Sequence, residues 1–165
     1  MLNPKKIPPQ IGYYLAGFAD GEGSFNVSFR KREDYNTKWK ISLCFNISQK
    51  DPVILSTFKR YLRCGTMRKR KDGVWYYEVN NFNSILENVI PFFSHFRFRS
   101  QKMKRAFSKF KKIAQILKSE KPITKDILKE VLELRNEMNE THKRKFSDDE
   151  ILKDFSSSET IRQTK

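Results

Sequence analysis

The sequence predicts an α+β fold in which helices cover one face of a four-stranded antiparallel sheet. Apolar and polar residues alternate strictly along two long segments, which is the pattern of half-buried strands. Apolar residues recur every three or four positions in the segments around them, which indicates amphipathic helices. The chain has 165 residues, 14 of them Phe, so it can fill the core of one domain.

The first expected element is a helix from Ile11 to about Asp20, after a leader of residues 1–10. Pro8 and Pro9 end the leader and suit a helix start. The helix is apolar and has an unusual share of small residues. We therefore expect it to be little exposed to solvent.

Two strands should follow this helix, at Ser24–Arg32 and Lys38–Gln49, with a polar loop between them. Their alternation gives the hairpin one apolar face, which the helices must cover. The residues of that face are Phe25, Val27, Phe29, Trp39, Ile41, Leu43, Phe45 and Ile47.

A helix starting at Pro52 and a second hairpin come next. Gly65 ends the helix, and strands Thr66–Lys71 and Val74–Asn80 flank Asp72-Gly73, which favours a two-residue turn. Trp75, Tyr77 and Val79 should lie on the covered side of this hairpin.

Two further helices complete the αββαββα order. The third begins near Asn83, and Pro91 either kinks it or begins a new turn. The fourth, Gln101–Lys118, is basic with an apolar side.

The remainder should add helices at the C-terminal end. An amphipathic helix is expected at Asp126–Glu140, which closes a domain spanning residues 11–140. Residues 141–165 form a charged extension, with one short helix near Asp148–Phe155 and then flexible chain.

The charge balance narrows the class of partner. There are 34 Lys and Arg against 19 Asp and Glu, a net charge of +15, and such a surface suits a polyanion or a membrane surface. Cys44 and Cys64 have no second Cys or His at metal-ligand spacing, so an intracellular, reducing setting is expected. No apolar stretch is long enough to span a bilayer. Bacterial cytoplasm, plastid and mitochondrion all remain open.

The uncovered face of the sheet is polar and basic. Its side chains are of the types that pair with base edges and phosphates in a major groove, although an ordinary solvated sheet face is polar too. The residues proposed to bind DNA are Asn26, Ser28, Arg30, Arg32, Lys38, Lys40, Ser42, Cys44, Asn46, Arg68, Arg70, Tyr76, Glu78 and Asn80.

The run Leu15–Ser24 decides between these readings. Ten consecutive residues, LAGFADGEGS, resemble the signature of the LAGLIDADG homing endonucleases of the single-motif, homodimeric type, and the surrounding element order matches as well. Gly17 and Gly21 lie one helical turn apart, so two copies of this helix could approach closely.

This resemblance implies a function and a central site. Motif helices of two subunits would pack through Ala16, Gly17 and Gly21. Glu22, with the carbonyl of Gly21, would bind Mg²⁺, or another divalent cation such as Mn²⁺. Each sheet would lie in the major groove of one half of a long, roughly palindromic DNA site. The expected activity is a metal-dependent, staggered double-strand cut by an intron-encoded enzyme, with no membrane or small-molecule partner.

Further site residues are carried over from the family pattern. Gln49 matches the water-holding position at the end of the second strand, and Lys102 the basic residue at the start of the fourth helix. Arg99 and Lys50 are alternatives to Lys102. Asp20 should have a structural role, such as a hydrogen bond at a helix end.

Two other functions stay open at this point. Relatives of the same fold include RNA maturases and nucleic-acid-binding proteins that do not cleave, although the retained Glu22 argues against a loss of activity. A purely structural basic protein would bind DNA weakly and without sequence preference.

Overall fold

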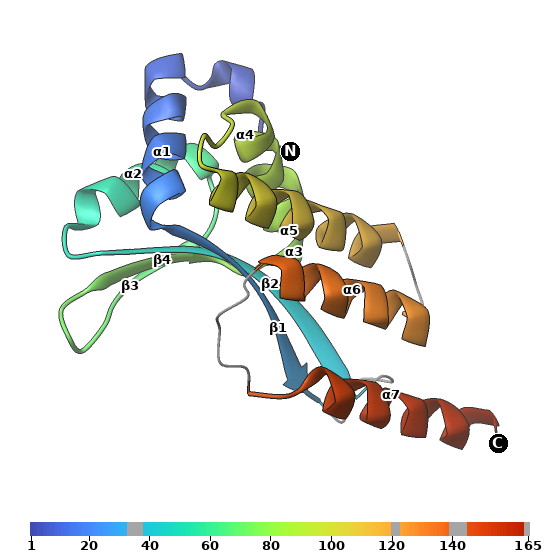
Figure 1. Ribbon diagram of the computed structural model, residues 1–165. Coiled ribbons are helices and arrows are strands. Elements are labelled where there is room, and N and C mark those ends of the chain that lie inside the picture. Colours follow the sequence, from blue (N-terminus) through green and yellow to red (C-terminus); the bar gives the residue numbers. More distant parts are fainter. Residues whose placement is uncertain (33–37, 120–122, 139–144, 164–165) are drawn as a thin grey trace. The chain divides into compact units, whose positions relative to one another are not determined.

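A computed structural model describes residues 1–32, 38–119, 123–138 and 145–163, with side chains up to Phe155. The chain divides into two units, residues 1–26 with 43–107 and residues 27–42 with 108–165. The predicted α+β class and αββαββα order are confirmed, and Figure 1 shows the elements along the chain.

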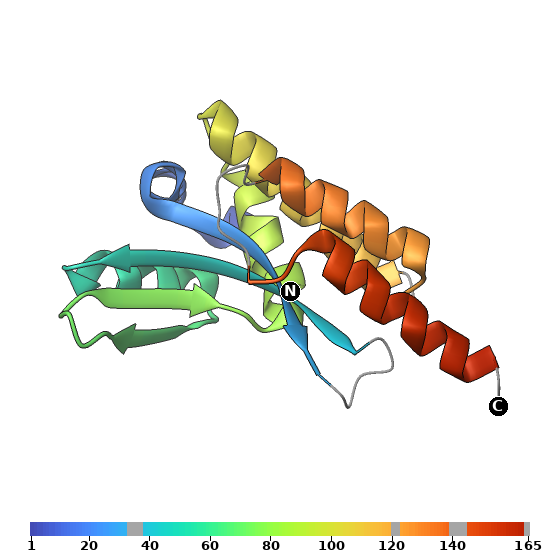
Figure 2. The same ribbon diagram turned by 60° about the horizontal axis from the view of Figure 1, so that its bottom comes forward.

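The four strands form one antiparallel sheet in the order β1-β2-β4-β3. They are β1 (Gly23–Lys31), β2 (Trp39–Gln49), β3 (Thr66–Lys69) and β4 (Trp75–Val79). The two hairpins join through β2 and β4 (Figure 2), where Phe45 pairs with Val79 and Gln49 with Trp75. Strand β1 begins and ends one residue earlier than predicted, and the other three strands are one or two residues shorter than predicted. Lys38 lies outside β2 because its φ of 56° is left-handed rather than extended.

The predicted two-residue turn at Asp72-Gly73 is wrong, because the second hairpin closes through a three-residue loop. The Arg70 amide donates to the Val74 carbonyl at 2.8 Å, and the Gly73 amide donates to the Arg70 carbonyl at 3.1 Å. Gly73 has a φ of 84°, which completes a turn followed by a left-handed glycine. The Asp72 carboxylate accepts from the Val74 amide at 3.0 Å and holds the loop.

Helix α1 (Pro9–Glu22) is longer than predicted at both ends and runs directly into β1 (Figure 1). Gly23 makes this junction possible. A Cβ on Gly23 would lie 2.6 Å from the carbonyl oxygen of Ala19, so only glycine lets the chain leave the helix this tightly. Glu22 is consequently the last residue of the helix and sits immediately before a strand.

The third predicted helix is a composite of α3 (Phe82–Ser84), the π-helical η2 (Ile85–Val89) and α4 (Ile90–His95). Pro91 does not break it, but proline has no amide to offer the carbonyl of Glu87. That carbonyl instead accepts from the amide of Leu2 at 2.7 Å. The N-terminal segment is thereby attached to this helix.

Residues 1–10, assigned above to a leader, are packed in the structure. They contain a short 3₁₀ helix, η1 (Pro4–Lys6). Leu2 and Ile7 are buried. This segment therefore contributes to the core of its unit.

The core of the first unit is aromatic. The Phe25 ring lies 5.1 to 5.8 Å, centroid to centroid, from the rings of Phe45, Phe93, Phe98 and Phe107. Helix α2 (Pro52–Leu62) adds Phe58, which stacks on Tyr77. These contacts confirm the predicted apolar face of the strands in this unit, because Phe25, Phe45 and Tyr77 are all fully buried.

The second unit packs helices on the remaining part of the first hairpin. It contains the later residues of α5 (Gln101–Ser119), with α6 (Lys125–Met138) and α7 (Asp148–Gln163). Figure 1 shows α6 and α7 side by side, and the two helices are in contact. Helix α7 is longer than the short helix predicted, and its Ile151 and Phe155 are buried.

Candidate metal and nucleic-acid site

The C-terminal turn of α1 concentrates negative charge. Asp20 and Glu22 lie in this turn, and it contains no basic residue. The last carbonyls of a helix have no partner within it, and the dipole makes this end negative. Glu22 is exposed, and among the described residues it makes no hydrogen bond or ion pair. The last turn of α1 therefore supplies no positive charge of its own to balance this end.

Asp20 ties this turn to the start of α5, 80 residues further along the chain. One carboxylate oxygen accepts from the amides of Arg99 and Ser100 at 3.0 and 2.8 Å. The other accepts from the Ser100 hydroxyl at 2.6 Å. The Ser100 oxygen in turn accepts from the amide of Met103 at 3.2 Å and so caps α5. The predicted helix-end role of Asp20 is confirmed.

The ionisation of Asp20 follows from these contacts. Partial burial opposes its charge, but hydrogen bonds from Ser100 and Arg99 and the nearby charge of Lys104 hold its pKa below the ordinary value. Asp20 is thus a carboxylate at neutral pH with its oxygens already occupied. Glu22 is the acid of this turn that remains available to a ligand.

The hydrogen bonds of Asp20 bring together two segments that carry predicted site residues, the end of α1 and the start of α5. Glu22 follows Asp20 by two residues, and Lys102 follows Ser100 by two residues in the exposed first turn of α5. Arg99 takes part through its amide. Both alternatives for the basic residue at the start of α5 therefore lie at the junction with α1.

No hydrogen bond among the described residues links the other two candidates, Gln49 and Lys50, to the junction of α1 and α5. Gln49 is the last residue of β2 and is partly exposed, and its side chain forms no hydrogen bond with another described residue. Lys50 is exposed and precedes Asp51, whose carboxylate caps α2 at the amide of Val53. Their roles remain predictions.

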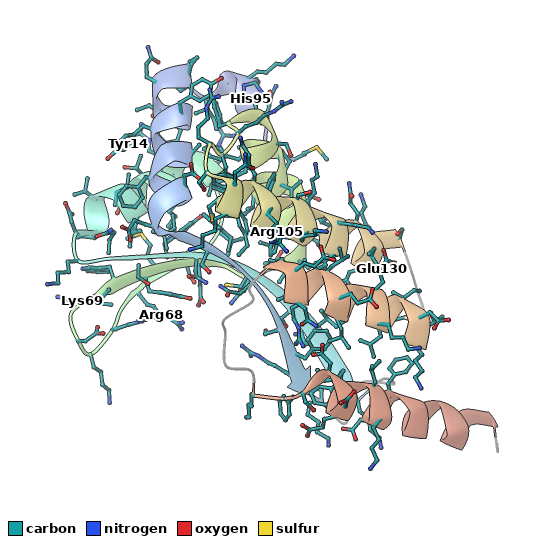
Figure 3. The ribbon with its side chains drawn as sticks, viewed as in Figure 1. Tyr14, Arg68, Lys69, His95, Arg105 and Glu130 are labelled. Atoms are coloured by element: carbon teal, nitrogen blue, oxygen red, sulfur yellow. The ribbon has the colours of Figure 1, made fainter. Side chains whose placement is uncertain are left out.

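Contacts among the described residues do not explain the two glycines predicted for the dimer interface. A Cβ on Gly17 or Gly21 would meet nothing within 4 Å, and neither has a positive φ. Glycine inside a helix costs about 1 kcal/mol relative to alanine. Tyr13 and Tyr14, beside them on the helix, are more than half exposed, and Figure 3 shows Tyr14 projecting from α1. This surface of α1 has the composition of an interface.

A groove of about 260 Å³ runs beside the same helix. It is lined by Tyr13, Ala16, Gly17, Asp20, Arg97 and Arg99. Ala16 is only 2% exposed, so most of its surface is used within its own subunit. Its place in a dimer interface remains a prediction.

The residues predicted to bind DNA all have accessible side chains. None of the 14 is buried. In the first unit, the guanidinium carbons of Arg68 and Arg70 lie 5.1 and 4.6 Å from the centre of the Tyr76 ring. Arg68 also pairs with Glu78 at 3.3 Å, and Figure 3 shows Arg68 on the hairpin of β3 and β4. Two cations and one carboxylate are thus held around one aromatic ring.

The second unit carries the remaining candidates near the first hairpin's tip. Arg30, Arg32 and Lys40 are exposed, and Ser28, Lys38 and Ser42 are at least partly accessible. Lys31 lies between Arg30 and Arg32, so its side chain points to the other side of the strand. It pairs with Asp154 of α7 at 2.9 Å. The alternation predicted along β1 therefore separates its neighbouring cations onto different sides of the strand.

The excess positive charge belongs to the first part of the chain. Residues 1–119 contain 24 of the 34 Lys and Arg but 8 of the 19 Asp and Glu. In the remainder, acids slightly outnumber bases, and several of them pair with cations of their own unit. Glu130 pairs with Lys112, and Glu137 with Lys109. Two basic residues of α5, Lys109 and Lys112, are therefore paired with acids of the second unit.

Two kinds of site are absent from the part of the chain that the structure describes. It contains no group of three or more His, Cys, Asp or Glu side chains able to hold a metal ion. No described helix is long and apolar enough to cross a membrane. Neither Cys44 nor Cys64 forms a disulfide in the described part of the chain, and burial raises the pKa of Cys64 to about 11.

Sequence reasoning missed the residues that hold the site in place. Ser100 precedes an amphipathic helix, so its role as an N-cap could have been predicted from the local sequence. Its bond to Asp20 and the contribution of Arg97 to the groove could not, because both depend on packing between distant segments. The same holds for Asp154 and its pairing with Lys31.

Comparison with known proteins agrees with this architecture. The family model described as LAGLIDADG endonuclease matches residues 15–114, more than half of the chain. DNA endonuclease I-CvuI of Chlorella vulgaris is 31% identical over 131 residues, which are 76% of this chain and 74% of that protein. Probable intron-encoded endonuclease 2 of Neurospora crassa is 28% identical over 83% of this chain, but the match covers 29% of that longer protein.

A solved structure shares both fold and length. The archaeal intron-encoded homing endonuclease I-Vdi141I, complexed with DNA, superposes with a TM-score of 0.79 at 28% identity. The match covers 92% of this chain and 97% of that one. The motif, the sheet and these matches together show that the chain belongs to the LAGLIDADG endonuclease family.

Proposed function

We propose that two copies of this chain form a sequence-specific homing endonuclease that makes a staggered double-strand cut in a long, roughly palindromic DNA site. The observation that carries the proposal is Glu22, an exposed carboxylate without a partner among the described residues, at the negative end of α1. A divalent cation would balance both the carboxylate and the helix dipole.

The donor atoms at this position fit Mg²⁺, or another hard divalent cation such as Mn²⁺. Glu22 offers a carboxylate, and Gly21 offers a carbonyl that helix geometry leaves without an internal partner. Mg²⁺ prefers oxygen ligands and keeps several waters, so few protein ligands are needed. The described residues of one chain contain no group of three or more His, Cys, Asp or Glu side chains able to hold a metal ion, so we place the site between the Glu22 carboxylates of two subunits.

Bound there, the metal would activate water and stabilise the charge that develops on the phosphate. The protein side chains would position the groups around it. Gln49 would orient the attacking water by a hydrogen bond, and Lys102, or Arg99, would offset negative charge on the leaving oxygen. Asp20 would hold the end of α1 and the start of α5 together without touching the DNA.

The sheet supplies the means of recognising DNA. Arg68 and Arg70 offer donors suited to guanine, and Glu78 offers an acceptor suited to cytosine. The stacking on Tyr76 holds the arginines in place before DNA arrives. Two of the similar proteins support the same partner, since one is named a DNA endonuclease and another was solved as a DNA complex.

The decisive experiment separates binding from cutting. Glu22→Gln keeps the size of the side chain but removes its charge, so it should bind the target and lose cleavage. Glu133→Gln is the matched control, because Glu133 is an exposed acid of α6, and it should cut normally. Full cutting by Glu22→Gln would overturn the mechanism. Specific binding of DNA without cutting by the unaltered chain in Mg²⁺ would instead indicate a non-cleaving relative.

A further inference from the structure

The part of the first hairpin that lies in the second unit cannot be stable on its own. Strand β2 pairs with β4 only between Phe45 and Gln49, so the residues of β1 and β2 beyond that ladder form a two-stranded ribbon. Such a ribbon is marginally stable in water unless something covers it. It nevertheless carries Arg30 and Lys40 among the DNA-binding candidates.

Helices α6 and α7 and the residues just before α7 cover this ribbon through three side-chain contacts. Each pairs an aromatic ring or a cation of the hairpin with a partner near the C-terminus. Arg135 of α6 lies 4.6 Å above the Phe29 ring. The Trp39 ring meets Phe146 edge to face at 4.9 Å. Lys31 pairs with Asp154 of α7 at 2.9 Å.

A single carboxylate links the two helices of this cover. The carboxylate of Asp148, in the first turn of α7, accepts from the Arg135 guanidinium and from the side-chain amide of Asn136, the latter at 2.7 Å. Arg135 is 8% exposed, the one charged residue among those buried in the described chain. The cation that packs on the hairpin is therefore itself fixed by α7.

We propose that α6 and α7 form a brace that holds residues 27–32 and 38–42 in the shape needed to read the outer base pairs of each DNA half-site. The proposal rests on the DNA-cleaving function argued above. It assigns catalysis to the first unit, which contains Glu22, Gln49 and Lys102, and outer recognition to the second.

The position of these base pairs follows from strand geometry. Ser28 and Arg30 follow Glu22 by six and eight residues, and a strand advances about 3.3 Å per residue. They are thus about 20 to 26 Å of strand away from Glu22. One base pair occupies about 3.4 Å of duplex. The brace should accordingly control discrimination about six to eight base pairs from the cut.

The test compares Asp154→Asn with Asp149→Asn, an exposed residue of the same helix whose substitution changes the net charge equally. Base preference is measured at every target position in the full-length protein. Asp154→Asn should lower a fivefold or greater preference at the outer positions to about twofold or less, while the central positions and the cutting of the best target stay unchanged. Lys31→Asp combined with Asp154→Lys should restore the outer preference.

Hydrogen exchange distinguishes this proposal from the function on which it rests. Amides of residues 27–32 and 39–42 should exchange faster in Asp154→Asn than in Asp149→Asn, whether or not the protein cuts DNA. Equal exchange and equal outer preference in the two variants would overturn the brace. An equal loss of preference at all positions would do so as well, since it would indicate a general loss of stability. If the unaltered protein cuts no specific target, the proposed function fails, and the exchange data still decide whether the brace exists.

Discussion

Two carboxylates two residues apart have different roles because their surroundings differ. Asp20 accepts hydrogen bonds from Ser100 and Arg99, whereas Glu22 is exposed at the end of the helix. Sequence spacing alone shows only that the two should point apart on a helix. The contacts show that the Asp20 carboxylate is occupied by hydrogen bonds, and we propose Glu22 as the metal ligand.

This assignment predicts a pH-dependent effect of Asp20→Asn. Since the pKa of Asp20 is lowered in the folded protein, its stabilising effect is present above the unfolded pKa, about 3.9, and is lost as pH falls through the folded value. At pH 7 the variant should be less stable by about 1–3 kcal/mol. Below about pH 4 the difference in free energy of unfolding should shrink.

Urea denaturation between pH 3 and 7 measures this difference. Asp51→Asn is the control, because Asp51 caps α2 locally and Asn is an equally good cap. A constant difference for Asp20→Asn across the whole pH range would show that its hydrogen bonds do not depend on its charge.

Tyr76 is expected to act through its ring rather than its hydroxyl. The ring lies beside two guanidinium groups, and burial raises the pKa of its hydroxyl, which stays protonated at neutral pH. Tyr76→Leu should weaken DNA binding by about 1 kcal/mol, roughly fivefold, and relax preference at the bases that Arg68 and Arg70 reach. Tyr76→Phe should bind nearly normally in a fluorescence titration. An equal loss in both variants would assign the role to the hydroxyl.

At the scale of elements, the glycines of α1 distinguish packing within a chain from packing between chains. A Cβ on Gly12 would lie 2.2 Å from the Phe96 ring, so Gly12→Ala should destabilise the monomer. Gly17 has open space around it. Gly17→Leu should therefore leave the monomer as stable as before or raise its stability by up to about 1 kcal/mol, yet abolish both dimerisation and cutting. Analytical ultracentrifugation with thermal unfolding checks both parts. A dimeric, active Gly17→Leu variant would refute the interface.

The secondary structure was predictable wherever one local pattern determines it. Strict alternation correctly identified β1 and β2 and their covered face, because one side of each strand is buried. The hydrogen bond that satisfies the helix carbonyl opposite Pro91 was not predictable, because it joins Glu87 to Leu2, a residue distant in the sequence. The three-residue loop at Gly73 was missed because an Asp-Gly pair suits more than one hairpin turn.

The candidate site was predictable to a different extent. The motif alone pointed to Glu22 and the two glycines, since ten consecutive residues matched one pattern. The tie between Asp20 and Ser100 spans 80 residues, and no periodicity in the sequence reveals it. The α7 part of the brace, with Asp148 and Asp154, lies in a segment that composition alone suggested was a charged, partly flexible extension.

At the scale of the whole molecule, the excess positive charge lies in the same part of the chain as the residues proposed for catalysis and DNA binding. The excess of Lys and Arg lies in residues 1–119, which hold both the catalytic candidates and the DNA-binding face. Acids of the C-terminal helices pair with cations of the same unit, as Asp154 does with Lys31. Cations on the other side of β1, such as Arg30, are exposed and accessible to DNA phosphates. In the second unit, an acid of α7 thus pairs with the cation on one side of β1, and Arg30 on the other side stays exposed.

Because the chain carries one motif, the assembly should be a two-fold dimer that presents two identical reading faces. A target rebuilt as two copies of the preferred half-site should bind at least as tightly as any asymmetric target with the same central sequence. Each mismatched pair restored in the weaker half should recover about 1–3 kcal/mol. Competition binding at fixed salt measures this, and a non-specific duplex of equal length controls for the charge contribution. If one asymmetric target bound more tightly than both of its palindromic derivatives, the two subunits would have to read DNA differently, and a symmetric dimer would be excluded.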